Sequence, residues 1–534
     1  MALTEGAERS RSRSPRKSPE IEGDDEAATC GYSARDLFLN PNNKTGFTYD
    51  DIILLPGQIN FDIGDVELET QFSRRITLKA PIVSSPMDTV TESRMAIAIA
   101  LHGGIGVIHR TMDIEAQVGE VVKVKKYKNG FITDPKCLSP TMKMSEYLQL
   151  RASAGFNGFP VTSDGKMGST LVGLVTRRDT DFMEHEGHLL VSEFMTPFDK
   201  LFTAPENVSL EEAYQLVAKS KKSKLPIISE DRRLVALVSQ TDLKKRNDFP
   251  LATKSANKSL RVAAAVGTHP SEQGRVRALA IAGVDAVVID QKQGDTSEQA
   301  DMIRWIKKEV PEIDVIGGNV VTRMQAKHLV DAGADGLRVG MGVGSVSRAQ
   351  DVAACGRAQA SAVFHTSLIA REAGIPIIAD GGIGSPGHII KSLCMGASVA
   401  MCGSLLAGCE ESPGDYFFSE TGMRLKAIRG NQSLETLNRS SSEKDQGRMK
   451  RSGAQIMVAQ GVSGTVQDKG SMFSYLPYLM QSLKHGLQDI GMQSVTKLHN
   501  NLHSFQLRFE LRSAAAQKEG GVHGLHSFER KLYA

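Results

Sequence analysis

Residues 337–349, with the sequence LRVGMGVGSVSRA, hold the groups most suited to chemistry in this chain. Glycines alternate after a short apolar run, and two serines follow: Gly340, Gly342, Gly344, Ser345 and Ser347. This spacing is typical of a nucleotide-binding loop, because glycines let backbone N–H groups approach phosphate oxygens. Ser347 offers a hydroxyl nucleophile, but a serine needs a general base close by. Its neighbours supply none, since Ala349 has no hydroxyl and Arg348 is a permanent cation.

Two further glycine loops indicate the same kind of ligand. They are Asp380-Gly381-Gly382 and Gly403-Ser404, each at the end of an apolar run. In a barrel of parallel strands, the loops after the last two strands form the usual phosphate site. The Asp380 carboxylate suits the two hydroxyls of a ribose as a bidentate acceptor. Together the three loops predict a nucleotide site, and the alternative is that they are tight turns only.

The elements that must position these loops repeat one unit: an amphipathic helix, a glycine and a short apolar strand. Continuously apolar strands are typical of parallel strands buried on both faces. Eight such strands are predicted, at residues 81–85, 104–109, 261–267, 284–290, 314–320, 335–340, 376–380 and 397–404. Eight units favour an α/β fold of the (β/α)8 TIM-barrel type over an open sheet. Polar residues and a glycine fall at the carboxyl ends of these strands, the face that holds barrel active sites: Ser85, Asp290, Asn319, Arg338, Asp380 and Gly403.

An internal repeat interrupts the barrel pattern. Each copy has the pattern of strand, turn, strand and a Thr/Ser-x-x-Asp helix start, preceded by an amphipathic helix. The two helices and copies are residues 144–154 with 159–179, and 210–220 with 225–242. Two such halves resemble a pair of cystathionine-β-synthase (CBS) motifs. That resemblance implies that Asp179 and Asp242 grip the ribose of an adenine or guanine nucleotide; the alternative is that they cap the following helices.

These patterns predict four segments along the chain. The CBS pair occupies residues 131–247, in halves 131–187 and 191–247, and is inserted inside the second βα unit. The barrel then comprises residues 31–130 and 248–534. Residues 1–30, which include RSRSRSPRKS, are too polar to bury a core and are expected to be disordered. The alternative for this tail is a phosphorylated Ser/Arg segment or a nuclear address.

The overall composition excludes several classes of protein. The net charge of +3 over 534 residues gives no basic stripe for nucleic acid. The sequence contains no run of about 18 apolar residues, so no membrane span is predicted. The N-terminus lacks the apolar core of a signal peptide. The six cysteines are scattered without metal-ligand spacing and are expected to be free thiols in a reducing compartment. We therefore expect a cytoplasmic protein, with a nuclear location as the alternative.

From about residue 33 to the C-terminus, the sequence resembles the inosine-5′-monophosphate (IMP) dehydrogenase family. The matching stretches are APIVSSPMDT at 80–89, VIGGN at 315–319, VAQGVSG at 458–464 and EGGVH at 519–523. The family's loop reads GLRVGMGSGSICIT, so Ser347 stands in place of its Cys and Ala349 in place of its Thr. The resemblance implies NAD-dependent oxidation of IMP to xanthosine monophosphate (XMP), a step of guanine nucleotide synthesis. It also implies a tetramer through the barrel and an octamer through the CBS pairs.

The resemblance carries the family's site residues onto this sequence position by position. The implied contacts to IMP are Ser85, Gly344, Ser345, Asp380, Gly381, Gly382, Gly403, Ser404, Gly430 and Gln460. Those implied for NAD are Asp290, Asn319, Arg338 and Gly340. A potassium ion is implied at the carbonyls of Gly342, Gly344 and Ser347, together with Glu519, Gly520 and Gly521 of a neighbouring subunit. Arg448 matches the flap arginine that activates water.

The departures from the family gather around the reacting atoms. In the family a Cys thiolate adds to C2 of IMP, and a thiol pKa of about 8.5 can be lowered to give that thiolate. Besides Ser347 and Ala349, the departures are Ile428 and Met449 for two tyrosines, Asn431-Gln432 for Met-Gly, Gln291-Lys292 for two serines, and Arg110 for a histidine. The residues matched to the family's phosphate and ribose contacts are kept. By ancestry, the expected activity is the family's NAD-dependent oxidation of IMP, with Ser347 as the nucleophile. The chemistry of these departures favours the alternative, a catalytically weak, purine-nucleotide-binding regulatory subunit that co-assembles with active paralogues. A guanosine monophosphate (GMP) reductase is a third and weaker option, because that relative also uses a Cys at this loop.

Overall fold

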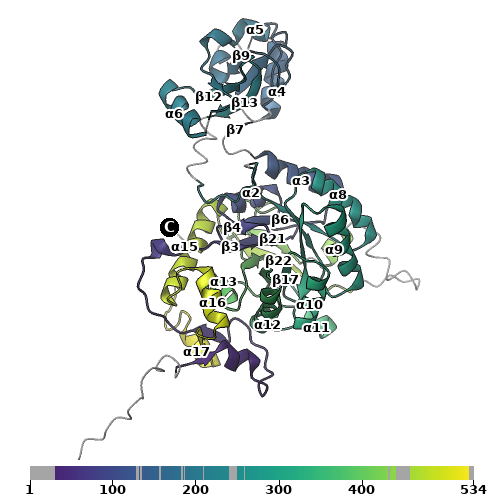
Figure 1. Cartoon of the computed structure of the whole chain (residues 1–534), viewed down its shortest axis with the longest axis vertical. Helices are drawn as coiled ribbons and strands as arrows, with labels where there is room; N and C mark the ends of the chain where they lie inside the picture. The colour runs from purple at the N-terminus through teal and green to yellow at the C-terminus, as the bar shows by residue number, and fades with distance from the viewer. Residues whose placement is uncertain are drawn as a thin grey trace, which may run out of the picture.

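The main body of the molecule is a closed barrel of eight parallel strands, in the order β5-β6-β14-β15-β16-β17-β18-β19 (Figure 1). The computed structural model describes residues 30–127, 131–132, 135–154, 158–181, 185, 187–208, 210–239, 249–257, 259–430, 433–439 and 458–527. The barrel strands are β5 (Ile82–Ser84), β6 (Ile105–Ile108), β14 (Ala263–Val266), β15 (Ala286–Ile289), β16 (Asp314–Val320), β17 (Gly336–Val339), β18 (Ile377–Asp380) and β19 (Val399–Cys402). The predicted (β/α)8 TIM barrel is therefore confirmed, with a strand inside each of the eight predicted ranges.

The barrel interior is an apolar core that is closed at the amino ends of the strands. Asp380, at the carboxyl end of β18, is the one residue of these eight strands that is not buried. Side chains such as Val288, Ile378 and Met401 fill the interior. A short hairpin of β3 (Thr70–Gln71) and β4 (Thr77–Leu78) adds Phe72 and Ile76 to the same cluster. The strand ends that carry the predicted site residues therefore lie at the opposite end of the barrel.

Helices surround the barrel (Figure 1). They are α2 (Ser93–Leu101), α3 (Ile114–Lys126), α8 (Gln273–Ile281), α9 (Ser297–Glu309), α10 (Arg323–Asp331), α12 (Gln359–Glu372), α13 (Pro386–Cys394) and α15 (Met472–Asp489). Several begin at a side chain that accepts a hydrogen bond from a backbone N–H of the first turn, as Asp113, Thr296, Thr322 and Ser385 do. These caps explain why the helices begin where they do.

The repeat forms a separate lobe beyond one end of the barrel body (Figure 1). One sheet pairs β8 (Gly158–Thr162), β9 (Leu171–Thr176) and β10 (Thr196–Pro197); the other pairs β11 (Ala204–Pro205), β12 (Lys224–Ile228), β13 (Leu234–Ser239) and β7 (Phe131–Ile132). The helices are α4 (Met144–Ala154), α5 (Val191–Phe194) and α6 (Leu210–Ser220). Each half has its own apolar cluster. Because α3 is complete before the lobe begins, the insertion follows the second βα unit rather than lying inside it.

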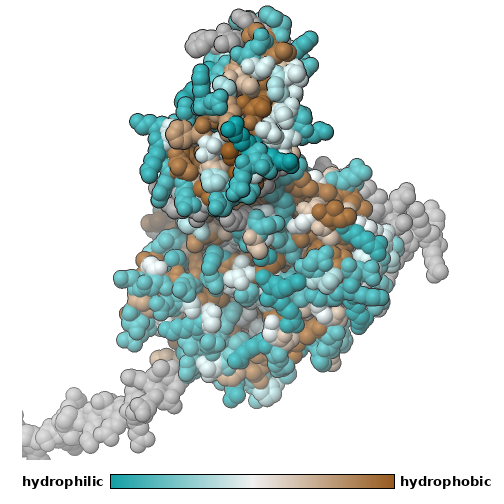
Figure 2. Space-filling model, turned by 45° about the horizontal axis from the view of Figure 1, so that its top comes forward, coloured by the Kyte–Doolittle hydropathy of each residue, from teal (hydrophilic) through white to brown (hydrophobic). Residues whose placement is uncertain are grey.

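The remaining elements decorate the barrel. An antiparallel sheet of β20 (Phe417–Phe418), β21 (Arg424–Arg429) and β22 (Ser463–Gln467) follows the last barrel strand, and β1 (Tyr32–Ser33), β23 (Arg508–Leu511) and β2 (Ile52–Leu54) form another. The further helices are α11 (Ala349–Ala353), α14 (Leu434–Arg439), α16 (Val495–His503) and α17 (Ala514–Glu519). On the face drawn in Figure 2, hydrophilic and hydrophobic residues are interspersed. Among the described residues, none of the helices is both long and apolar enough to cross a membrane.

Candidate active site

Two adjoining cavities lie among the loops at the carboxyl ends of the barrel strands. Their volumes are about 220 Å³ and 300 Å³. Five residues line both cavities: Val343, Gly344, Val346, Asp380 and Gly381. The cavities therefore form one cleft with a shared wall.

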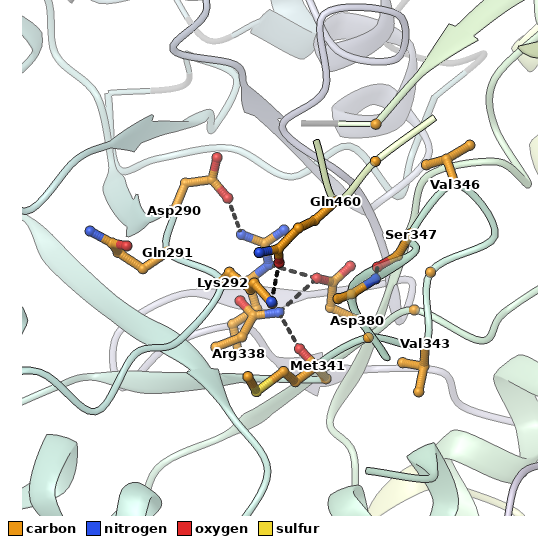
Figure 3. A pocket seen from close by; sticks show the side chains of 18 of the residues that line it. Asp290, Gln291, Lys292, Arg338, Met341, Val343, Val346, Ser347, Asp380 and Gln460 are labelled. Atoms are coloured by element: carbon orange, nitrogen blue, oxygen red, sulfur yellow. Dashed lines mark hydrogen bonds and ion pairs between the residues drawn. The ribbon is translucent and has the colours of Figure 1, made fainter. Parts of the chain in front are cut away.

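The two parts of the cleft differ in what lines them. Beyond the shared wall, the larger cavity, here the glycine half, is lined by Ser85, Met87, Ser345, Gly382, Ile383, Gly384, His388, Met401, Gly403 and Ser404. The smaller one, here the charged half, is lined by Arg110, Asp290, Gln291, Lys292, Asn319, Arg338, Gly340, Met341, Gly342, Ser347, Ala349, Gly430, Gln460 and Gly461 (Figure 3). The residues predicted for IMP and NAD contact from the barrel strands, with Gly430 and Gln460, all line one half or the other.

In the glycine half, the backbone of neighbouring loops comes into close contact at glycine residues. Gly381 has a φ of +95°, and a Cβ there would lie 2.9 Å from Val343 Cγ2 and 3.3 Å from the backbone nitrogen of Gly344. A Cβ at Gly403 would lie 3.0 Å from Met87 Sδ. Larger residues at these positions would fill the space between the loops. The predicted convergence of three loops is therefore what the structure shows.

A network of ion pairs around the buried Arg338 joins the strand ends in the charged half. Arg338 donates through Nη1 to Asp290 Oδ1 at 2.7 Å and through Nε to Asp380 Oδ2 at 3.0 Å (Figure 3). Burial opposes the charge of Arg338, but the carboxylates of Asp380 and Asp290 outweigh it and raise the pKa of the guanidinium. Arg338 thus fixes both carboxylates, and Asp380 Oδ1 accepts no hydrogen bond from a described residue.

Asn319 presents an acceptor to the same half. Its Nδ2 donates to the carbonyl of Gly340 at 2.7 Å and to Asp380 Oδ2 at 3.0 Å. Its Oδ1 is buried and has no donor among the described residues. Leaving a buried acceptor unpaired is costly, so this oxygen suits a ligand that brings a hydroxyl or amide N–H.

Ser347 is held by backbone contacts rather than by a base. Its Oγ accepts from the backbone N–H of Ala349 at 3.3 Å, and its own N–H donates to the Gly344 carbonyl at 3.0 Å. It also forms a β-bridge with Gly461. Within the described part of the chain, no histidine or carboxylate forms a hydrogen bond with Ser347 Oγ. The geometry therefore supplies no general base in contact with this hydroxyl.

Residues 460–462 cover the loop that holds Ser347. The N–H of Arg348 donates to the Gln460 carbonyl at 2.6 Å, and the N–H of Val462 donates to the Val346 carbonyl at 2.9 Å. The Lys292 ammonium donates to Gln460 Oε1, so this covering segment is tied to the end of β15 (Figure 3).

The two halves of the cleft contain no cysteine side chain among their lining residues. All six cysteines are free, as expected. Burial raises the pKa of Cys402 and of Cys409 to about 12 each. These buried thiols are therefore protonated at neutral pH and unsuited to nucleophilic attack.

Other predicted residues lie elsewhere. Arg448 and Asp242 fall outside the described residues. Asp179 accepts through Oδ2 from the backbone and hydroxyl of Thr176, at 2.7 and 2.8 Å, and through Oδ1 from Thr196 at 3.0 Å. Glu519 ends α17 and is followed by Gly520 and Gly521; none of the three lines the cleft of its own chain.

Sequence reasoning missed His388, which lines the glycine half. Its Nδ1 accepts from the Gly384 N–H at 3.2 Å, and its Nε2 lies 3.0 Å from Asp50 Oδ1. The available signal was its place in the first turn of α13, just after the Gly381-Gly382 loop.

Comparisons with known proteins identify the family. The sequence matches the IMP dehydrogenase / GMP reductase domain family over residues 46–523. It is 49% identical to the inosine-5′-monophosphate dehydrogenase of Schizosaccharomyces pombe and 46% identical to that of Toxoplasma gondii, over 94% of this chain and 96% and 100% of those proteins. A GMP reductase from Trypanosoma brucei, solved with guanosine 5′-monophosphate, is 31% identical, with a TM-score of 0.83 over 91% of this chain and 99% of that one. The chain therefore belongs to the IMP dehydrogenase / GMP reductase family.

Proposed function

We propose that this protein binds a purine nucleoside monophosphate in the cleft and is impaired in the family's NAD-dependent oxidation of IMP. One contrast carries the proposal: the glycine half is complete, while Ser347 has no base in contact with its hydroxyl. In this proposal the protein serves as a nucleotide-binding regulatory subunit that assembles with active relatives.

The cleft supports a defined placement of the nucleotide. The phosphate would bind backbone N–H groups of the glycine half, as it does at the equivalent face of other barrels. Asp380 Oδ1, which accepts no bond from a described residue, would accept from the ribose hydroxyls. The base would then extend past the shared wall toward Ser347 and Gln460. The complex of the related GMP reductase with guanosine 5′-monophosphate supports this ligand class.

The charged half offers a partial fit to NAD. The unpaired Asn319 Oδ1 suits a donor from the ribose or the carboxamide, and Asp290, Arg338 and Gly340 line the same space. NAD, when bound, accepts the hydride that leaves C2 of IMP. This chain's residues would hold and orient the reactants, but Ser347 cannot provide the thiolate on which the family's oxidation depends.

The cation and the assembly are carried over from the family as parts of the proposal. Potassium would bind the carbonyls of Gly342, Gly344 and Ser347, with the 519–521 segment of a neighbouring subunit. The Gly342 carbonyl already accepts from Gln350 Nε2 at 3.0 Å, which leaves its second lone pair for the ion. A tetramer or larger is expected, and light scattering at micromolar concentration that found a monomer would contradict this.

The inserted lobe is proposed to bind adenine or guanine nucleotides as a CBS pair. Its two-sheet architecture, with a helix before each repeat copy, is consistent with that assignment. The Asp179 carboxylate is occupied by Thr176 and Thr196, so a ribose would have to displace these bonds.

An active dehydrogenase is the second candidate, because the identity to curated IMP dehydrogenases extends over 94% of the chain. Measuring NADH formation from IMP and NAD by the purified protein distinguishes an active dehydrogenase from a catalytically impaired regulatory subunit. Sustained turnover at a rate typical of enzymes would favour the second candidate.

Nucleotide binding is tested independently of turnover. A ligand at a hundredfold excess over its Kd stabilises the folded state by about 2.7 kcal/mol, so IMP should raise the melting temperature. Asp380→Ala should remove most of that shift, whereas Asp301→Ala, at a side chain 75% exposed on α9, should leave it unchanged. Absence of a shift with any purine monophosphate at millimolar concentration would refute the proposal.

A further inference from the structure

The charged half contains a cation whose bonding partner is neutral. Lys292 follows β15 in the sequence Asp290-Gln291-Lys292, and its ammonium donates to the amide oxygen of Gln460 (Figure 3). Lys292 forms no ion pair with any described residue. Its side chain is only partly exposed, so water compensates its charge incompletely.

The nearby carboxylates are already engaged by arginines. Arg338 bonds to Asp290 and Asp380 at 2.7 and 3.0 Å, and Arg110 Nε lies 3.9 Å from the other oxygen of Asp290. Three cations and two carboxylates line this half, and the carboxylates are paired with Arg338 and Arg110. The lining therefore has an excess positive charge at Lys292.

A bound nucleotide would place its base next to this charge. With the phosphate in the glycine half and the ribose at Asp380, the base faces Ser347, Gln460 and Lys292 across the shared wall. The ammonium has three donors, of which Gln460 uses one. The other two remain available to an oxygen on the edge of the base.

We propose that Lys292 makes this site selective for a purine monophosphate whose base is anionic. The xanthine ring fits this description, because its two oxo groups let it lose a ring proton near neutral pH. The hypoxanthine and guanine rings remain neutral there. This inference rests on the proposed nucleotide binding and adds a preference among the nucleotides.

Two roles of Lys292 must be separated. If the ammonium only ties Gln460 over the loop, its loss should weaken every nucleotide equally. If it recognises the base, its loss should weaken the anionic nucleotide alone. The ratio of affinities for XMP and IMP isolates the second role, because the phosphate and ribose are common to both.

The test is isothermal titration of the full-length protein with XMP, IMP and GMP. At pH 8 we expect XMP to bind about tenfold more tightly than IMP or GMP, a ratio that corresponds to one compensated charge in a partly buried site. The ratio should fall as the pH is lowered through the titration of the xanthine ring, because the protonated ring is neutral. Lys292→Gln should abolish the preference and leave IMP binding within about twofold.

Lys327→Gln is the matched control, since Lys327 is 59% exposed on α10 and is paired with Asp331. It should change none of the three affinities. Equal binding of the three nucleotides to the unmodified protein would overturn the inference while leaving nucleotide binding intact. If Lys292→Gln weakened the binding of all three nucleotides equally, the inference would also be overturned. Lys292 would then act only by holding Gln460 over the loop that contains Ser347. Failure of all three nucleotides to bind would refute the proposed function itself.

Discussion

The two halves of the cleft share a wall but are built from different parts of the chain. In the glycine half, backbone at Gly381 and Gly403 comes so close to neighbouring atoms that side chains are excluded. In the charged half, the side chains of Arg338, Lys292 and Gln460 make the contacts. In the proposed complex, backbone N–H groups would recognise the phosphate and tolerate substitution of nearby side chains, whereas the reaction and recognition of the base would depend on single side chains.

Asp380 couples the halves. It lines both cavities, and its Oδ2 is held by Arg338 and Asn319 from the charged half. In the proposed complex, a change among the ionic residues would therefore alter how Asp380 holds the ribose, even though the glycine loops stay in place. The contrast between the halves is testable because each side can be changed separately.

The largest expected effect concerns turnover. Removing an activated nucleophile outright costs roughly 10⁶ in rate, so IMP oxidation by this protein should be several orders of magnitude slower than that of a cysteine enzyme. Ser347→Cys alone should restore little, because Ala349, Ile428 and Lys292 remain. NADH formation under saturating IMP and NAD measures the turnover of the unmodified protein and of Ser347→Cys. Robust activity after this one change would show that the surrounding substitutions are neutral.

The next effect is on stability. Arg338→Met removes the buried cation that bridges Asp290 and Asp380, whose carboxylates are partly buried. Removing one partner of a buried pair costs about 3–5 kcal/mol, and the partial exposure of these carboxylates puts the expected loss at the lower end of that range. Equilibrium unfolding in urea measures the loss. Arg304→Met, at a surface pair 60% exposed, should cost no more than about 1 kcal/mol. Equal losses in the two variants would contradict the role given to Arg338.

The fold and the glycine half could be predicted because their signals are local. Continuous apolar runs set the strands, and a glycine after several of the helices, as at Gly283, Gly333, Gly374 and Gly396, marks the next strand. The loops after β17, β18 and β19 then converge because parallel strands place their carboxyl ends on one face.

The charged half could not be assembled in the same way. The Lys292–Gln460 contact in this half joins residues 168 positions apart. In the glycine half, the contact of His388 with Asp50, which sequence reasoning also missed, spans 338 positions. Lys292 and His388 do not interrupt a periodic pattern of the sequence, so the residues next to them do not indicate which distant residue each one contacts. Likewise, the Thr/Ser-x-x-Asp signal located Asp179 but did not reveal that Thr196 occupies its second oxygen.

A smaller effect tests the backbone origin of the glycine half. Gly381→Ala places a Cβ 2.9 Å from Val343 Cγ2, on backbone with a φ of +95°, and should weaken IMP binding by about tenfold or more. Gly387→Ala is the matched control, since Gly387 lies in the first turn of α13 and a Cβ there would lie 3.7 Å from Oγ of the N-cap residue Ser385, an ordinary contact. Titration of IMP gives both affinities. Unchanged binding in Gly381→Ala would mean that the close approach of these loops is not needed for the phosphate.

The smallest expected effect is a difference in the affinity of the charged half for NADH and for NAD. Oxidised nicotinamide carries a positive ring and the reduced form does not, while the phosphates of NAD and NADH are the same. Because this half has an excess positive charge at Lys292, NADH should bind a few times more tightly than NAD, as expected for a single repulsion between partly solvated charges. Lys292→Ser should narrow the difference, Lys327→Ser should not, and added salt should reduce it because solvent ions screen the repulsion. Fluorescence titration of NADH, with NAD as competitor, reports the ratio without requiring turnover. If NAD binds as tightly as NADH and Lys292→Ser changes neither affinity, the excess charge at Lys292 does not reach the nicotinamide.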